Sequence, residues 1–288
     1  FSPVNFKKEQ KPVIITEYLI NGSLNDIINL ERKGLCKDQW NETRKLINIY
    51  GIASAMSFLH SHEIIHRDLK PDNILMDDFL FPRVTDFGLS KMKNTNAESM
   101  TLQSAQGIKG TPLYIAPEIW SHFDYSKPID VYAFGLIVYE IVTTEIPFKN
   151  ESYFTLIEKV VNGKRPEIKC IPDSYKTLIE KCWDQNPSNR PTFDEIVETL
   201  KNDPGFITEL VEENDYLDYI DYIESYKATF NISKKIKIEE FFKRQNKTLK
   251  KEKIDQNLIQ QVKEENKKMS IEEEKSSIKV NLLHINYD

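Results

Sequence analysis

The most informative stretch of the chain is His66-Arg67-Asp68-Leu69-Lys70-Pro71-Asp72-Asn73. It places a carboxylate, an amine two residues later and a carboxamide five residues later in one short segment. Asp86-Phe87-Gly88 and Ala116-Pro117-Glu118 follow it in that order. A chance match to even one such motif is rare in a chain of this length, and three motifs in the right order indicate a functional site. A charged turn between two strands, the alternative for the first motif, does not account for the other two.

These three motifs resemble the catalytic core of a protein kinase. The resemblance implies an α+β, protein kinase-like fold, with a mainly helical large lobe and only a remnant of the small-lobe sheet. It also implies ATP and Mg²⁺ as cofactors and a protein as the substrate. In such a site Asp68 orients the substrate hydroxyl and accepts its proton, and Lys70 neutralises the transferred phosphate. Asn73, which we count with these catalytic residues, and Asp86 supply oxygen ligands to magnesium.

Three segments bear on which hydroxyl is phosphorylated. The form Asp68-Leu69-Lys70-Pro71-x-Asn73 resembles serine/threonine kinases, and the run from Gly110 to Glu118 indicates the same. The segment from Cys182 to Phe193 resembles instead the end of tyrosine-kinase and tyrosine-kinase-like domains. The combination implies the tyrosine-kinase-like group with serine/threonine specificity, and a place in signal transduction.

Other matching positions resemble structural residues of kinases. Glu118 and Arg190 resemble the buried ion pair of the large lobe, in which loss of one partner leaves an uncompensated charge. Asp130 resembles the residue that hydrogen-bonds the backbone of the catalytic loop. His66 resembles a structural residue of that loop, and a role as proton acceptor is the alternative.

The same resemblance implies residues for the half of a nucleotide site that binds adenine and ribose. Thr16 resembles the gatekeeper residue, and Glu17 and Leu19 resemble residues that offer backbone groups to adenine. Leu75 resembles the floor beneath the base, and Asp26 could reach the ribose. Because a strand followed by a turn is a common pattern, a purely structural role for these residues stays open.

The segment from Asp86 to Glu118 is the expected activation segment. Arg67 directly precedes Asp68, and a kinase with such an arginine usually needs an anion to pair with it. A phosphate on the segment could supply that anion through charge-assisted hydrogen bonds. The alternative for most of these hydroxyls is ordinary loop solvation. The candidate phosphate acceptors are Ser99, Thr101, Ser104 and Thr111.

The phosphate-covering half of the site has no counterpart in the sequence. None of the nine glycines belongs to a Gly-x-Gly-x-x-Gly loop. Too few residues precede the strand-like Val13-Ile14-Ile15 to include the lysine that grips the phosphates or its glutamate partner. Because the chain also begins with Phe1, we expect a kinase that lacks most of its small lobe. Two functions are then open: an active kinase whose front end is missing here, or an inactive kinase-like module that binds or scaffolds proteins.

Composition excludes several other classes of protein. The chain has 288 residues, a net charge of −6 and 40% hydrophobic residues, which is typical of a globular protein. An acidic balance gives no reason to expect a nucleic-acid partner. The apolar run Val131–Val142 is too short to span a membrane. Three cysteines without metal-ligand spacing fit a reducing cytoplasm.

Apolar periodicity and capping patterns predict a mainly helical chain between residues 23 and 202. One expected helix begins at Ser23. The others cover Trp40–His60, Pro128–Thr144, Ser174–Trp183 and Thr192–Leu200. A strand is expected over Val13–Tyr18.

The sequence Asn202-Asp203-Pro204-Gly205 ends the helical pattern and marks a predicted boundary. Beyond it an acidic stretch gives way to a lysine-rich tail, either a solvated or disordered segment or a helix that docks a protein partner. The predicted parts are a small-lobe and hinge remnant (1–20), the large lobe (21–202), an acidic extension (203–233) and a charged tail (234–288).

Overall fold

The structure is a computed structural model that describes residues 17–36, 38–86, 112–122 and 124–229. It also describes three short strands outside these ranges: β1 (Asn5–Phe6), β2 (Glu9–Gln10) and β6 (Lys91–Met92). The segments between and beyond them, including residues 230–288, lie outside the described residues.

Two long helices, α2 (Glu42–Ser61) and α5 (Pro128–Thr143), form the centre of the described fold. Both are buried along most of their length, which accounts for their nearly continuous apolar sequences. Pro128 is the first residue of α5, where a missing N–H costs nothing. The helix ends at Thr143, because the next residue, Thr144, has a left-handed φ of 57° that cannot continue the helix.

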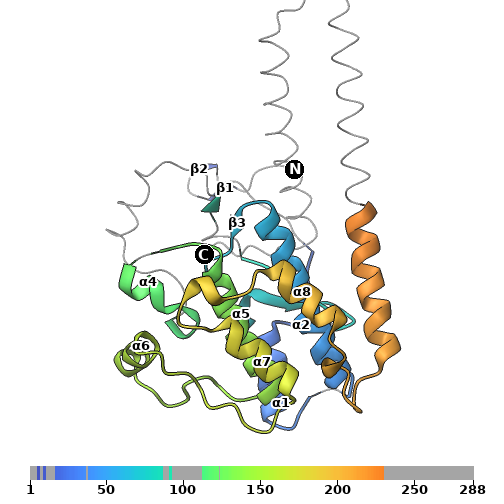
Figure 1. The fold of residues 1–288 in the computed structure, drawn as a ribbon. Coiled ribbons are helices and arrows are strands. Elements are labelled where there is room, and N and C mark those ends of the chain that lie inside the picture. The colour runs from blue at the N-terminus through green and yellow to red at the C-terminus, as the bar shows by residue number, and fades with distance from the viewer. Residues whose placement is uncertain are drawn as a thin grey trace, which may run out of the picture.

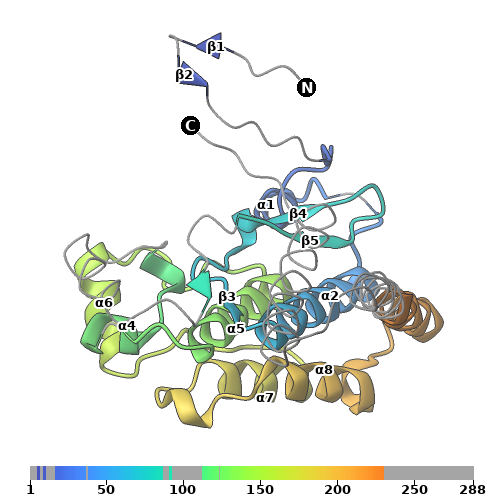
Figure 2. The same cartoon turned by 90° about the horizontal axis from the view of Figure 1, so that it is seen from above.

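The other helices surround this pair in layers (Figures 1 and 2). Figure 2 shows α7 (Asp173–Cys182) and α8 (Phe193–Asn202) along one side of the central helices, and α1 (Leu24–Arg32) on the other. Helices α4 (Pro117–His122) and α6 (Tyr153–Val161) lie together at one end.

Local sequence signals explain where two of the helices begin. Ser23 and Asp26 form a reciprocal capping box at the start of α1, and Thr192 and Glu195 form another at the start of α8. Each box satisfies backbone donors that the first turn of a helix leaves unpaired. The expected helix boundaries are therefore close to those of the structure.

The described strands are short and antiparallel. Strand β4 (Ile74–Met76) pairs with β5 (Pro82–Val84), and β3 (Ile64–Ile65) pairs with β6. Strands β1 and β2 pair with each other. The expected fold class, α+β with a mainly helical large lobe, is confirmed. Of the strand expected over Val13–Tyr18, only Glu17 and Tyr18 are described, and neither is in a strand.

The acidic extension continues the large lobe as far as it is described. After a short 3-10 helix (Pro204–Phe206), a helix over residues 213–229 lies beside α2. Tyr216, Tyr219 and Ile220 are buried on that side. The boundary at residue 202 remains a prediction. None of the helices in the described part of the chain is long and apolar enough to cross a membrane.

Candidate active site

The segment His66–Asn73 is a loop between β3 and β4, and the base of α5 holds its backbone. The Asp130 carboxylate accepts hydrogen bonds from the backbone N–H of His66 at 2.8 Å and of Arg67 at 2.9 Å. His60 on α2 lies 2.9 Å from the same carboxylate. Arg67 has a left-handed φ of 72°, a conformation that needs such support. The loop is therefore fixed from two central helices.

His66 is buried and joins Asp68 in the loop to Thr85, the residue before Asp86. Its Nε2 lies 2.8 Å from the carbonyl oxygen of Thr85, so this nitrogen carries the proton. Its Nδ1 then accepts the backbone N–H of Asp68 at 3.3 Å. Both ring nitrogens are engaged in positioning Asp68 and the strand before Asp86, which favours the structural role over that of a proton acceptor.

The three predicted catalytic side chains lie in contact. Lys70 Nζ is 2.9 Å from Asp68 Oδ2, and Asn73 Nδ2 donates to the same oxygen at 3.0 Å. Asn73 also donates to the backbone carbonyl of Asp68 at 2.7 Å. Two donors therefore fix the orientation of the Asp68 carboxylate. The carboxylate is only 11% exposed.

Asn73 and Asp86, the predicted magnesium ligands, are linked through Thr85, the residue that follows β5. The backbone N–H of Thr85 donates to the carbonyl of Asn73 at 2.8 Å, which places Asp86 one residue further on. The Asn73 amide nitrogen donates both of its hydrogen bonds to Asp68, so the amide oxygen is the atom that a bound cation would contact. A carboxylate and an amide oxygen suit Mg²⁺, which usually completes its coordination with water and phosphate oxygens. No group of three His, Cys, Asp or Glu side chains poised to hold a metal occurs among the described residues.

Of the expected adenine-site residues, Glu17, Leu19, Asp26 and Leu75 are described, and Thr16 lies outside the described residues. Leu75 on β4 forms a β-bridge with Ser23, at the end of the segment that carries Glu17 and Leu19. Asp26 uses one carboxylate oxygen to cap α1, at 2.8 Å from the Ser23 backbone nitrogen.

The activation segment is described only at its two ends. Ser99, Thr101, Ser104 and Thr111 lie outside the described residues. The guanidinium carbon of Arg67 lies 5.1 Å from the centre of the Tyr125 ring. Burial lowers the pKa of Arg67, and its Nε has no hydrogen-bond partner within the described part of the chain.

Sequence reasoning missed a second polar network, which joins α1, α5 and the end of the activation segment. Arg32 Nη2 lies 2.8 Å from Glu140 Oε2, and the Tyr114 hydroxyl donates to Glu140 Oε1 at 2.5 Å. Burial raises the pKa of Glu140, and the two hydrogen bonds oppose that rise. The only signal in the sequence is a glutamate inside an apolar helix, which does not reveal its partners.

Glu118, the first acidic residue of α4, lies in contact with Arg190. The guanidinium donates to both carboxylate oxygens, at 2.6 and 2.8 Å, and to the carbonyl of Pro128 at 3.0 Å. The Arg190 side chain is completely buried, so its charge depends on Glu118 for compensation.

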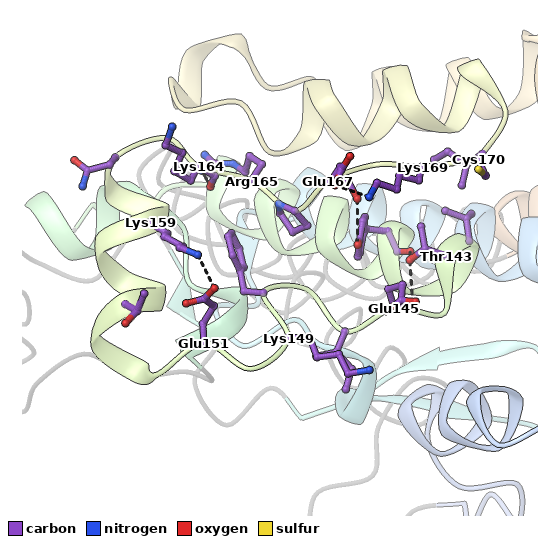
Figure 3. A pocket seen from close by; sticks show the side chains of 18 of the residues that line it. Thr143, Glu145, Lys149, Glu151, Lys159, Lys164, Arg165, Glu167, Lys169 and Cys170 are labelled. Carbon is purple, nitrogen blue, oxygen red and sulfur yellow. Dashed lines mark hydrogen bonds and ion pairs between the residues drawn. The ribbon is translucent and has the colours of Figure 1, made fainter.

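A large hollow of the described surface lies elsewhere, between α6, the end of α5 and the loop before α7 (Figure 3). It is an open space of about 1200 Å³ lined by many charged side chains. Two of its lysines are paired with carboxylates, Lys159 with Glu151 at 2.5 Å and Lys169 with Glu167 at 2.7 Å. Its size alone does not make it the active site, because the clustered catalytic side chains are in the His66–Asn73 loop.

Comparison with known proteins identifies the family of this arrangement. The protein kinase domain matches residues 4–200. The chain belongs to the protein kinase family. A probable serine/threonine-protein kinase of Dictyostelium discoideum is 34% identical over 212 residues, which are 68% of this chain and 23% of that protein. The dual specificity protein kinase pyk3 of the same organism is 38% identical over 212 residues, 72% of this chain and 15% of that protein.

A third relative, an RGS domain-containing serine/threonine-protein kinase of the same organism, is 37% identical over 65% of this chain and 16% of its own length. The chain thus spans less than a quarter of the length of each of these three relatives.

Proposed function

We propose that the protein catalyses ATP-dependent phosphoryl transfer to serine and threonine hydroxyls of protein substrates, in signalling. The observation that carries this proposal is the Asp68 carboxylate, which Lys70 contacts at 2.9 Å and Asn73 at 3.0 Å. Such a fixed carboxylate suits a reaction whose rate depends on positioning and electrostatic stabilisation.

Each residue of the loop has a proposed task. Asp68 accepts a hydrogen bond from the substrate hydroxyl, aims its oxygen and takes up the proton. Lys70 turns from Asp68 toward the transferred group and stabilises the charge that develops there. Asn73 holds Asp68 with its amide nitrogen throughout.

Asn73 and Asp86 are the proposed metal ligands, and the segment after Thr16 is the proposed nucleotide-binding segment. The Asn73 amide oxygen and the Asp86 carboxylate would hold the magnesium ion, which would supply positive charge to the phosphates. The backbone of Glu17 and Leu19 binds the adenine edge, Leu75 supports its face and Asp26 offers its second oxygen to the ribose. ATP and Mg²⁺ are therefore the proposed cofactors.

Specificity for serine and threonine rests on the Asp68–Asn73 sequence and on two of the relatives, which are named serine/threonine kinases. A third is named a dual specificity kinase, so tyrosine is the competing acceptor. We assign the chain to the tyrosine-kinase-like group because of the Cys182–Phe193 segment. A reducing cytoplasm is the proposed location, since all three cysteines are free.

The test uses the longest natural polypeptide that contains this chain. Incubation with radiolabelled ATP, Mg²⁺ and a mixture of protein substrates should produce phosphoserine and phosphothreonine after acid hydrolysis. Phosphotyrosine as the main product would overturn the specificity.

An inactive module that binds proteins is the second candidate, and the observation that favours it is the lack of a Gly-x-Gly-x-x-Gly loop in this sequence. The same assay separates the two functions. The inactive module would show no transfer above background at any ATP concentration.

A further inference from the structure

A row of polar side chains on α1 starts at the His66–Asn73 loop. Asn25 Nδ2 donates to Asp72 Oδ1 at 2.9 Å, which joins the first turn of α1 to that loop. One turn further along the helix, Asn29 Nδ2 donates to Asn25 Oδ1 at 3.2 Å. Arg32 Nη1 then donates to Asn29 Oδ1 at 2.9 Å. These three side chains share one face of α1, because they are four and three positions apart.

Arg32 continues the row to α5, where it fixes the carboxylate of Glu140. Its Nη2 lies 2.8 Å from Glu140 Oε2, and its Nε donates at 2.5 Å to the carbonyl oxygen of Thr144, the residue after α5. The Glu140 carboxylate is only 3% exposed, and its Oε1 accepts the Tyr114 hydroxyl at 2.5 Å. Because a charged donor holds this carboxylate, its second oxygen keeps one direction toward Tyr114. The hydrogen bonds therefore run without a gap from Asp72 to Tyr114.

Tyr114 lies beside the proposed catalytic residue. It is the last residue of the short 3-10 helix Pro112–Tyr114, at the end of the activation segment. A small hollow is lined by residues 67–69, which include Asp68, and also by residues 114–116. A protein substrate whose hydroxyl reaches Asp68 therefore lies close to the backbone around Tyr114.

We propose that Arg32 is a positioning residue for the protein substrate, because it holds Glu140 and thereby fixes the backbone around Tyr114 beside the His66–Asn73 loop. The hydrogen bonds of Arg32 within the described residues go to Asn29, Glu140 and Thr144, so it acts on the substrate through Tyr114. Its effect on the substrate rests on the proposed function, whereas its effect on the order of residues 112–122 does not.

The experiment breaks the row at two places. Arg32→Gln removes the charge that holds Glu140, and Tyr114→Phe removes only the hydroxyl. Tyr114→Phe leaves no buried charge without a partner, so it keeps the test decisive if Arg32→Gln does not fold. Arg165→Gln is the matched control, because this partly buried arginine also donates to a backbone carbonyl, that of Trp183 at 2.8 Å, but lies outside the row.

Two measurements are made on each variant and on the double variant of Arg32 and Tyr114. Amide hydrogen exchange is measured on the 288-residue chain for peptides covering residues 112–122. Steady-state kinetics are measured on the longest natural polypeptide that contains the chain.

Arg32→Gln and Tyr114→Phe should each speed exchange of the Ile115 amide, which donates to the carbonyl of Pro112, several-fold. Each should raise KM for a protein substrate about three- to tenfold, with KM for ATP nearly unchanged. Because both changes break one row of contacts, the double variant should be no worse than the more severe single variant. Arg165→Gln should lower the melting temperature without these changes.

Exchange equal to that of the wild type in either variant, or equal changes in Arg165→Gln, would overturn the proposal. An unchanged KM for the protein substrate in an active enzyme would also overturn it. So would effects that add in the double variant, because Arg32 would then act by a route other than Tyr114. If no transfer occurs in the wild type, the proposed function fails while hydrogen exchange still decides whether Arg32 orders residues 112–122.

Discussion

Arg190 and Glu118 form a two-pronged ion pair in which both guanidinium Nη atoms contact the carboxylate, at 2.6 and 2.8 Å. The pair joins the start of α4 to the turn before α8, and the arginine side chain has no exposed surface. Its geometry makes the end of the activation segment part of the large-lobe core.

Glu118→Ala should lower the free energy of unfolding by about 3–5 kcal/mol, because it leaves the Arg190 charge buried without compensation. Urea unfolding measures the change. Lys169→Ala, which breaks an exposed pair with Glu167, is the control and should leave the midpoint unchanged. Equal midpoints for Glu118→Ala and wild type would contradict the role given to the pair.

Gly51→Ala should destabilise the chain, although alanine favours a helix over glycine by about 1 kcal/mol. The new methyl group overlaps the Tyr219 hydroxyl and the Pro82 ring, and such overpacking costs about 1–3 kcal/mol. In a Tyr219→Phe background the cost should be smaller, because one of the two overlaps is gone. A stabilising Gly51→Ala in the wild-type background would show that the helix over residues 213–229 is not seated on α2.

Glu140 should make a recognisable contribution to the pH dependence of stability. Burial raises its pKa above the ordinary value of 4.5, so the folded chain holds this proton to higher pH than the unfolded chain does. The stability that Glu140 contributes is therefore present at low pH and is lost as pH rises through its raised pKa. The unfolding free energy of wild type minus that of Glu140→Gln should fall as pH rises above 4.5, the ordinary pKa of the carboxyl group. A difference that is constant or rises with pH would contradict this prediction.

Local signals in the sequence were enough to predict several elements. Ser23 with Asp26 and Thr192 with Glu195 marked helix starts, because a capping box depends only on residues three apart. The fold class followed from the three motifs. Glu118 and Arg190 could be paired in advance only through the family resemblance, since 72 residues separate them.

Other features could not be read from local sequence. The acidic stretch after Asp203 resembles a solvated segment, yet Tyr216 and Tyr219 are buried against Tyr50 of α2. Gly51 reads as a tolerated helix glycine, because only the folded chain brings Tyr219 against it. The contacts of Asp77 with Asn21 and Arg83 depend on the hairpin register, which no motif specifies.

The 288-residue chain by itself should bind ATP weakly and transfer no phosphate. Its sequence offers no glycine loop and no candidate lysine to position the β- and γ-phosphates, and positioning provides most of the rate in this chemistry. Radiolabelled ATP with the purified chain, and with Asp68→Asn as the contamination control, measures this. Transfer above the control would mean that other residues of this chain position the β- and γ-phosphates.

The central claim is that Asp68 orients and deprotonates the substrate hydroxyl, and Asp68→Asn tests it most directly. The substitution keeps the size of the side chain, so the melting temperature should change little. In the longest natural polypeptide that contains this chain, kcat for transfer from radiolabelled ATP should fall at least about 100-fold, the usual contribution of a general base. An Asp68→Asn enzyme that keeps more than about a tenth of wild-type kcat would contradict the role assigned to Asp68.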